Sequence, residues 1–144
     1  MKKTTLILLT LLLLSCNQNR ESQTLNIDEI IADSTTVYVF YFRINRRCEN
    51  CDAVGNVARN VVETRFADND NVRFIEIQNS VRANSPLLER YDVFWNALII
   101  AKGDDFVDIT QRAFLNVLRN PQMVENRIIE EIEKRLGDCG SSPQ

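Results

Sequence analysis

Apolar residues occur along this chain in two kinds of pattern, continuous runs and helical stripes. Residues 37–42 form a continuous β-branched and aromatic run, which is typical of a strand buried on both faces. Apolar positions within residues 52–66 recur at helical spacing, which predicts a helix. A polar turn follows at residues 68–71, and residues 72–77 then predict a second strand.

Shorter elements follow in the second half of the chain. Ser85-Pro86 opens a short helix that reaches about residue 91, because proline is favoured at the first helical position. Residues 97–101 and 105–110 predict two strands, and the turn at residues 102–104 joins them into an antiparallel hairpin.

The last predicted helix has clear start and stop signals. Asn120 is a capping residue, Pro121 occupies the first helical position, and Gly137 ends the helix. Its apolar stripe consists of Val124, Ile128, Ile129, Ile132 and Leu136. Residues 113–118 predict a further helical turn before it.

The order of these elements indicates the fold class. A strand, a helix and a second strand in succession form two parallel strands with a right-handed crossover. The hairpin adds an antiparallel edge. We therefore expect one domain over residues 35–137, an α/β three-layer sandwich with a mixed sheet of about four strands flanked by helices.

The first residues have the composition of a secretory signal. Lys2 and Lys3 give a charged start, and residues 6–14 form a short apolar run. A helix of that length rises only ~14 Å, which is too short to cross a bilayer. We expect residues 1–15 to be a signal peptide, and an N-terminal membrane anchor is the alternative.

The residues at the end of this run resemble a bacterial lipobox, because Leu13-Leu14-Ser15 precedes Cys16. The resemblance implies that Cys16 is lipidated and becomes the first residue of the mature chain. Acyl chains such as palmitate, at ~0.8 kcal/mol per buried methylene, would hold the protein on a lipid membrane. Asn17 rather than aspartate follows, which in lipoproteins favours the outer membrane. We expect a lipid-anchored protein of the cell envelope that faces the periplasm.

Two polar segments flank the predicted domain. Residues 16–34 contain three isoleucines at helical spacing and predict a tether that leads into a short amphipathic helix; a wholly disordered tether is the alternative. Residues 138–144 predict a flexible tail that contains Cys139. That thiol is either an incidental exposed group or a bridge to a partner or a second copy.

The amino-acid composition excludes several classes of catalytic site, metal site and partner. The chain has no histidine, which removes histidine acid–base catalysis, cysteine–histidine nucleophiles and most zinc or copper sites. Without Lys2 and Lys3, 15 basic residues face 20 acidic residues, for a net charge of −5. A mildly acidic surface with no basic run argues against nucleic acid as a partner.

The remaining candidate chemistry is Cys48-Glu49-Asn50-Cys51, which follows the first predicted strand and opens the first long helix. In an exported protein, cysteines at this spacing form a redox or a structural disulfide before anything else. A structural bridge across so small a loop stabilises little. A metal site needs more ligands than Cys48 and Cys51, and only Cys139 is at hand to add one. We therefore favour a redox pair with no metal, and the other two interpretations stay open.

This arrangement resembles the thioredoxin fold over about residues 37–136. Shorter stretches are similar to the small thioredoxin-like proteins of the ArsF family, described as nitrophenyl compound nitroreductase subunits. The stretches are residues 37–42, 46–51, 91–98, 110–114 and 119–121. The resemblance implies dithiol chemistry in a short exported protein that accompanies a membrane-embedded electron carrier. The nitroreductase label does not follow from these residues, and none of them resembles a flavin site.

Two positions depart from the thioredoxin pattern. The resemblance implies a buried acid on the strand before the motif, where this chain has Tyr41 and Phe42. It also implies a cis-proline before the third core strand, where this chain has Trp95-Asn96-Ala97. A cis bond without proline costs ~3–4 kcal/mol, so we expect a trans loop. In that loop we expect Trp95 to cover the site and Asn96 to bind substrate backbone; a plain core or edge aromatic is the alternative for Trp95.

Helix position assigns different roles to the two cysteines. Cys48 lies at the first turn, where free backbone N–H groups favour its thiolate, and Arg46 and Arg47 add positive charge. Cys51 lies one turn deeper and within reach of Cys48. We expect Cys48 to be the exposed nucleophile and Cys51 the buried resolving thiol. Glu49 opposes the arginines and tunes the couple.

Together these observations predict an exported, lipid-anchored thiol:disulfide oxidoreductase. A membrane-embedded electron carrier reduces it, and it passes electrons to an exported client protein that carries a disulfide. Its redox centre is the reversible Cys48–Cys51 disulfide, with no other cofactor. The alternative is a non-catalytic thioredoxin-like binding or assembly subunit, or a soft-metal chaperone.

Overall fold

The structure is a computed structural model that describes residues 26–46 and 48–137. The predicted signal peptide, Cys16, most of the tether, Arg47 and the tail with Cys139 lie outside the described residues. The elements, in chain order, are α1 (Ile27–Ala32), β1 (Val37–Arg43), α2 (Glu49–Arg65), β2 (Val72–Gln78), the 3₁₀-helix η1 (Arg82–Asn84), α3 (Ser85–Arg90), β3 (Ala97–Lys102), β4 (Asp105–Asp108), α4 (Thr110–Asn116) and α5 (Pro121–Gly137). Across this part of the chain, no helix is both long and apolar enough to span a membrane.

The strands form one four-stranded mixed sheet in the order β2-β1-β3-β4. α2 connects β1 to the parallel strand β2, and Phe40 pairs with Ile75. On its other side, β1 pairs antiparallel with β3, where Phe40 lies opposite Ile99. β3 in turn pairs antiparallel with β4. The predicted fold class is confirmed: the protein is an α/β sandwich with a four-stranded mixed sheet, consistent with a thioredoxin-like architecture.

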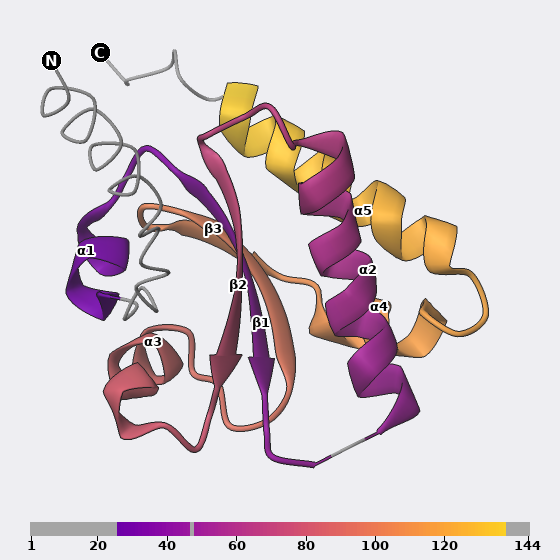
Figure 1. The fold of residues 1–144 in the computed structure, drawn as a ribbon, viewed down its shortest axis with the longest axis horizontal. Helices are drawn as coiled ribbons and strands as arrows, with labels where there is room; N and C mark the ends of the chain where they lie inside the picture. The colour runs from indigo at the N-terminus through magenta and orange to yellow at the C-terminus, as the bar shows by residue number, and fades with distance from the viewer. Residues whose placement is uncertain (1–25, 47, 138–144) are drawn as a thin grey trace, which may run out of the picture.

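Helices cover both faces of this sheet (Figure 1). On one face, α2, α4 and α5 pack against side chains that include Val39, Tyr41 and Ile100. On the other face, α1 and α3 pack against Phe40 and Ile99. Because successive side chains of a strand point to opposite faces, a strand covered on both sides needs apolar residues at every position. This double coverage explains the continuous apolar run of β1.

Some element boundaries differ from those expected. α4 begins at Thr110 rather than at residue 113, and β4 ends at Asp108 rather than at residue 110. The side chain of Asp108 accepts a hydrogen bond of 2.8 Å from the backbone N–H of Thr110. A carboxylate there satisfies one of the N–H groups that a helix start leaves without a partner, so the chain turns into the helix early. The short helix expected over the isoleucines before β1 forms as α1, with Ile27 buried.

Candidate functional site

Cys48 and Cys51 form a disulfide at the start of α2, the helix that follows β1. Their Cα atoms lie 5.1 Å apart. Cys48 is the N-cap residue of α2, and its Sγ accepts a hydrogen bond from the backbone N–H of Cys51 at 3.1 Å. A sulfur atom thus takes the place of the usual capping oxygen, at the positive end of a 17-residue helix.

The two cysteines differ in exposure. Cys48 is exposed, whereas Cys51 is only 5% exposed. This is the difference expected from their positions on the helix, and their roles as nucleophile and resolving thiol stay predictions. Of the predicted tuning residues, Glu49 lies exposed in the first turn of α2, and Arg47 lies outside the described residues. Arg46, two residues before Cys48, is exposed.

Tyr41 lies beneath the start of α2, on the strand where the resemblance implied a buried acid. Its side chain is buried, and its hydroxyl donates a hydrogen bond of 2.7 Å to the carbonyl oxygen of Cys51. Burial raises the pKa of Tyr41 to about 12. The phenol therefore stays protonated at neutral pH and acts as a donor, not as a base. Gly55 leaves room for its ring, since a Cβ atom there would lie 2.8 Å from Tyr41 Cε1.

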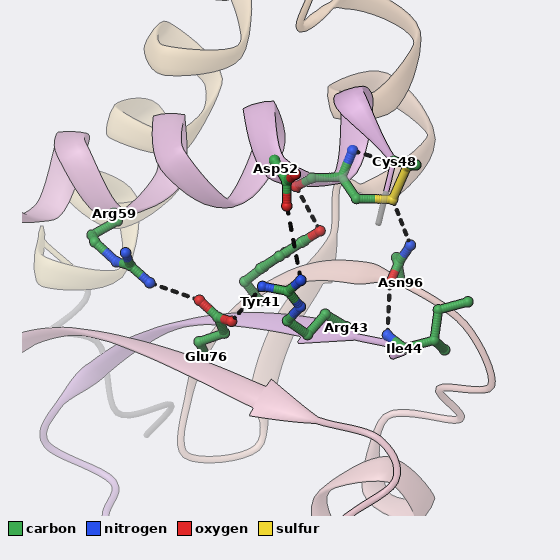
Figure 2. A network of polar contacts seen from close by, with 9 residues as sticks. Tyr41, Arg43, Ile44, Cys48, Asp52, Arg59, Glu76 and Asn96 are labelled. Carbon is green, nitrogen blue, oxygen red and sulfur yellow. Dashed lines mark hydrogen bonds and ion pairs between the residues drawn. A yellow bond between two sulfur atoms is a disulfide. The ribbon is translucent and has the colours of Figure 1, made fainter. Parts of the chain in front are cut away.

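A row of four charged side chains lies next to Tyr41, between α2 and β2 (Figure 2). Arg43 contacts Glu76 at 3.0 Å and Asp52 at 3.8 Å. Arg59 contacts the other oxygen of Glu76 at 2.6 Å. The hydrogen bond to Glu76 raises the pKa of Arg43 above its ordinary value. Both carboxylates in this row are therefore paired with arginine.

Sequence reasoning missed this row of charges. The parallel pairing of β1 with β2 places Tyr41 opposite Glu76, and Arg43 reaches the same carboxylate. The available signal was Glu76, which lies between the apolar residues Ile75 and Ile77 of β2. The register that brings it to β1 depends on two segments separated by a whole helix, so neither strand shows it alone.

Asn96 reaches the dithiol from the loop before β3 (Figure 2). Phe42 pairs with Ala97, so Asn96 lies beside the end of β1. Its Oδ1 accepts a hydrogen bond from the backbone N–H of Ile44 at 2.8 Å. Its Nδ2 donates to Cys51 Sγ at 2.9 Å. The described residues contain no cis peptide bond, so the loop is trans as expected. Asn96 thus contacts the sulfur of Cys51 itself, and its binding of substrate backbone stays a prediction.

Exposed apolar side chains lie in the loop before β3 and at α4. Phe94 and Trp95 are 75% and 71% exposed, which rules out a core role for Trp95. Its covering of the site stays a prediction. On the side of α4, the exposed Leu115 and Leu118 line a hollow of about 320 Å³ together with Asn50 of the Cys-x-x-Cys segment.

The reactive groups of this surface are the two sulfur atoms. Within residues 26–46 and 48–137, no group of three or more histidine, cysteine, aspartate or glutamate side chains is placed to hold a metal ion. The arrangement suits exchange of the Cys48–Cys51 bond with other thiols, since one sulfur belongs to an exposed residue and both accept N–H donors. No protein-family model matches the sequence, and no curated protein gives a significant match.

Proposed function

We propose that the protein is a thiol:disulfide oxidoreductase whose reacting atoms are the sulfurs of Cys48 and Cys51. The observation that carries this proposal is their disulfide at the N-terminus of α2, with one cysteine exposed and the other buried. A bridge across so short a loop adds little to the stability of the fold. We therefore infer that the Cys48–Cys51 disulfide is reversibly reduced and re-formed rather than serving to stabilise the fold.

The proposed reaction consists of two exchanges. The Cys48 thiolate attacks one sulfur of a client disulfide, and the other client sulfur leaves as a thiolate. The Cys51 thiolate then attacks Cys48 Sγ, which releases the second client thiolate and re-forms the Cys48–Cys51 bond. Two electrons pass to the client, and its thiolates take up protons from water. The dithiol of a membrane-embedded electron carrier restores the reduced pair by the reverse exchanges and becomes a disulfide.

The surroundings of the cysteines support this division of labour. The positive end of α2 and the exposed Arg46 favour the thiolate of Cys48. Exposure lets a bulky client approach Cys48, whereas burial keeps the same client from Cys51. A mixed disulfide should therefore form at Cys48, with Cys51 as the intramolecular attacker that resolves it.

Exposed apolar side chains support a protein as client. Phe94 and Trp95 are exposed in the loop that carries Asn96, and Leu115 and Leu118 line a hollow together with Asn50. Single exposed apolar residues are ordinary, but several large ones in the segments that contact the Cys-x-x-Cys segment suit contact with a polypeptide. We infer that the client presents apolar residues next to its disulfide.

We further propose that the protein works in the cell envelope, held on the outer membrane by lipid on Cys16 and facing the periplasm. The support is the charged start, the short apolar run and the lipobox-like residues before Cys16. Labelled palmitate should enter the protein in cells, and Cys16→Ser should abolish this labelling. Persistent labelling of the Cys16→Ser variant would remove this part of the proposal.

The central test replaces the resolving thiol. Cys51→Ser should trap clients as mixed disulfides through Cys48, visible as adducts on a non-reducing gel that a reductant releases. The double variant Cys48→Ser/Cys51→Ser is the matched control and should trap none. An absence of adducts in cells, together with no turnover of a small disulfide substrate by the unaltered protein, would overturn the proposal.

One observation favours a second function. The neutral Tyr41 occupies the region where the resemblance implied an acid, and a non-catalytic binding subunit or soft-metal chaperone needs no acid there. Thiolates are the preferred ligands of Cu(I). Stoichiometric Cu(I) binding by the reduced protein through Cys48 and Cys51, without client adducts, would favour that function over the first.

A further inference from the structure

We propose that Asn96 is a catalytic residue of the dithiol centre, which holds the Cys51 sulfur as a thiolate when the disulfide opens. The inference rests on the proposed oxidoreductase function and assigns a role to a group that touches a reacting atom. It starts from one contact, the hydrogen bond of 2.9 Å from Asn96 Nδ2 to Cys51 Sγ (Figure 2).

The orientation of the Asn96 amide follows from its other contact. The backbone N–H of Ile44 can only donate a hydrogen bond, and it points at the Asn96 side chain at 2.8 Å. The atom that faces Ile44 must therefore be the amide oxygen. The NH₂ group is then the one that faces Cys51, so the sulfur meets a donor rather than an acceptor.

The amide is also held in place before any reaction occurs. Asn96 directly precedes β3, whose Ala97 pairs with Phe42 of β1. One residue earlier, the carbonyl oxygen of Trp95 accepts a hydrogen bond of 2.9 Å from Asn79 Nδ2. A donor fixed by the surrounding structure stabilises developing charge without having to reorient during the step.

Among the described residues, the other groups around Cys51 do not donate a hydrogen bond to its sulfur. Tyr41 of β1 donates its hydroxyl to the Cys51 carbonyl oxygen, not to the sulfur. Arg43 of β1 is engaged with Asp52 of α2 and Glu76 of β2. None of these groups contributes a hydrogen bond to Cys51 Sγ, and Asn96 is the side chain that does.

The role of Asn96 follows from the negative charge that Cys51 Sγ gains in the exchange step. When an attacking thiolate bonds to Cys48 Sγ, the Cys48–Cys51 bond breaks and its electron pair goes to Cys51 Sγ. A hydrogen bond to an ionised acceptor is roughly twice as strong as one to a neutral acceptor. Asn96 therefore stabilises the opened state more than the disulfide, and it keeps Cys51 deprotonated for the return attack.

The test is the equilibrium of the purified protein with reduced and oxidised glutathione, from about pH 5 to about pH 9, a range that spans typical thiol pKa values. Asn96→Ala should shift the equilibrium about tenfold toward the disulfide, which is about 30 mV for a two-electron couple. Asn96→Asp keeps the size of the side chain and the acceptor for Ile44, but it places a negative charge at the sulfur. Its shift should be larger and in the same direction, and should shrink at acid pH, where the carboxyl group regains a proton to donate.

Asn79→Ala is the matched control. It removes a side-chain donor that holds the same loop but contacts the Trp95 carbonyl oxygen instead of a sulfur. Its equilibrium with glutathione should stay within about twofold of the unaltered protein, well below the tenfold step of 30 mV. A merely structural role of the loop would instead move Asn79→Ala and Asn96→Ala together.

The outcomes separate this inference from the function on which it rests. If both Asn96 variants exchange with glutathione as the unaltered protein does, at every pH, the role of Asn96 is wrong and the oxidoreductase function stands. If the unaltered protein itself forms no reversible equilibrium with glutathione, the proposed function fails. Should Asn96→Ala fold poorly, Asn96→Asp still decides, since it keeps the size of the side chain and the acceptor for Ile44. An equilibrium of Asn96→Asp equal to that of the unaltered protein at every pH would contradict the contact of this side chain with the sulfur.

Discussion

Polar groups are buried at both ends of β3, but they are neutral at one end and charged at the other. At the end where β3 begins, the backbone and the sulfur of Cys51 are contacted by two neutral donors, Tyr41 and Asn96. At the end where β3 stops, Glu131 and Arg135 of α5 are buried as ions in contact with each other. We call these the dithiol end and the ionic end.

Charges at the ionic end are paired with one another within the fold. Glu131 contacts both Arg127 and Arg135, and Asp105 of β4 lies 3.0 Å from Nε of Arg135. Lys102 at the end of β3 donates to the carbonyl oxygen of Arg135 at 2.8 Å. No reactive atom takes part. At the dithiol end, the donors Tyr41 and Asn96 are neutral, which suits the proposed redox centre, because the charge that changes in that reaction is the charge of the sulfur.

The largest effect should come from breaking the ionic end. Glu131→Ala removes the buried carboxylate from Arg135 and, among the described residues, leaves only the exposed carboxylate of Asp105 to pair with it. Removal of one partner from a buried pair costs about 3–5 kcal/mol. Urea unfolding of the oxidised protein measures this loss. The exposed neighbour Glu130 is the matched control, and Glu130→Ala should change stability by less than about 1 kcal/mol. Equal effects would mean that burial does not distinguish the two carboxylates.

Alkaline pH should act on the dithiol end through Tyr41. Burial raises its pKa from 10.0 to about 12, so its contribution is complete below pH 10 and is lost as pH rises toward 12. The free energy of unfolding should fall by about 2–3 kcal/mol over this range from Tyr41 alone. Tyr41→Phe should remove that part of the pH dependence in urea unfolding.

The other two tyrosines, the buried Tyr38 and the partly buried Tyr91, provide the reference for this experiment. Tyr38 and Tyr91 also have pKa values raised by burial, and they remain in both proteins. The difference between the two pH profiles therefore isolates Tyr41. Parallel profiles above pH 10 would contradict the burial of its protonated hydroxyl against Cys51.

Much of the fold was predictable because buried faces of helices and strands require apolar residues at characteristic spacings in the sequence. The all-apolar β1 indicated coverage on both faces, and the stripes of α2 and α5 indicated their packed sides. Capping and turn residues marked where elements change. The position of Cys48 and Cys51 followed from the same signals, because the motif lies between a strand and a helix that were both recognisable.

Contacts that depend on register were not predictable in this way. Glu131 and Arg135 are residue types typical of a solvated face, but both are buried on the same side of α5 as Val124 and Ile128. Arg135 also contacts Asp105 of β4, which is distant in sequence. The contact of Asn96 with Cys51 depends on how β1 and β3 align. Such pairings join segments distant in sequence, so no local pattern records them.

Packing at the dithiol end can be tested with a single methyl group. Gly55→Ala places Cβ at 2.8 Å from the buried ring of Tyr41, and overpacking of this kind costs about 1–3 kcal/mol. The higher helix propensity of alanine offsets up to about 1 kcal/mol. We expect a net loss of about 1–2 kcal/mol in urea unfolding. Gly137→Ala is the control, because nothing lies within 4 Å of its Cβ position, and it should not destabilise the protein.

The smallest effect should come from an ion at the dithiol end. Asp52 directly follows Cys51, but its side chain is 53% exposed and lies 3.8 Å from Arg43. Exposed pairs of this kind contribute about 0–1 kcal/mol, so Asp52→Asn should change stability by about 0.5 kcal/mol or less. Its equilibrium with glutathione should also stay within about twofold of the unaltered protein, because solvent screens the lost charge. A shift as large as that expected for Asn96→Asp would show that ions, rather than neutral donors, control the charge of the dithiol, and the contrast between the two ends of β3 would be lost.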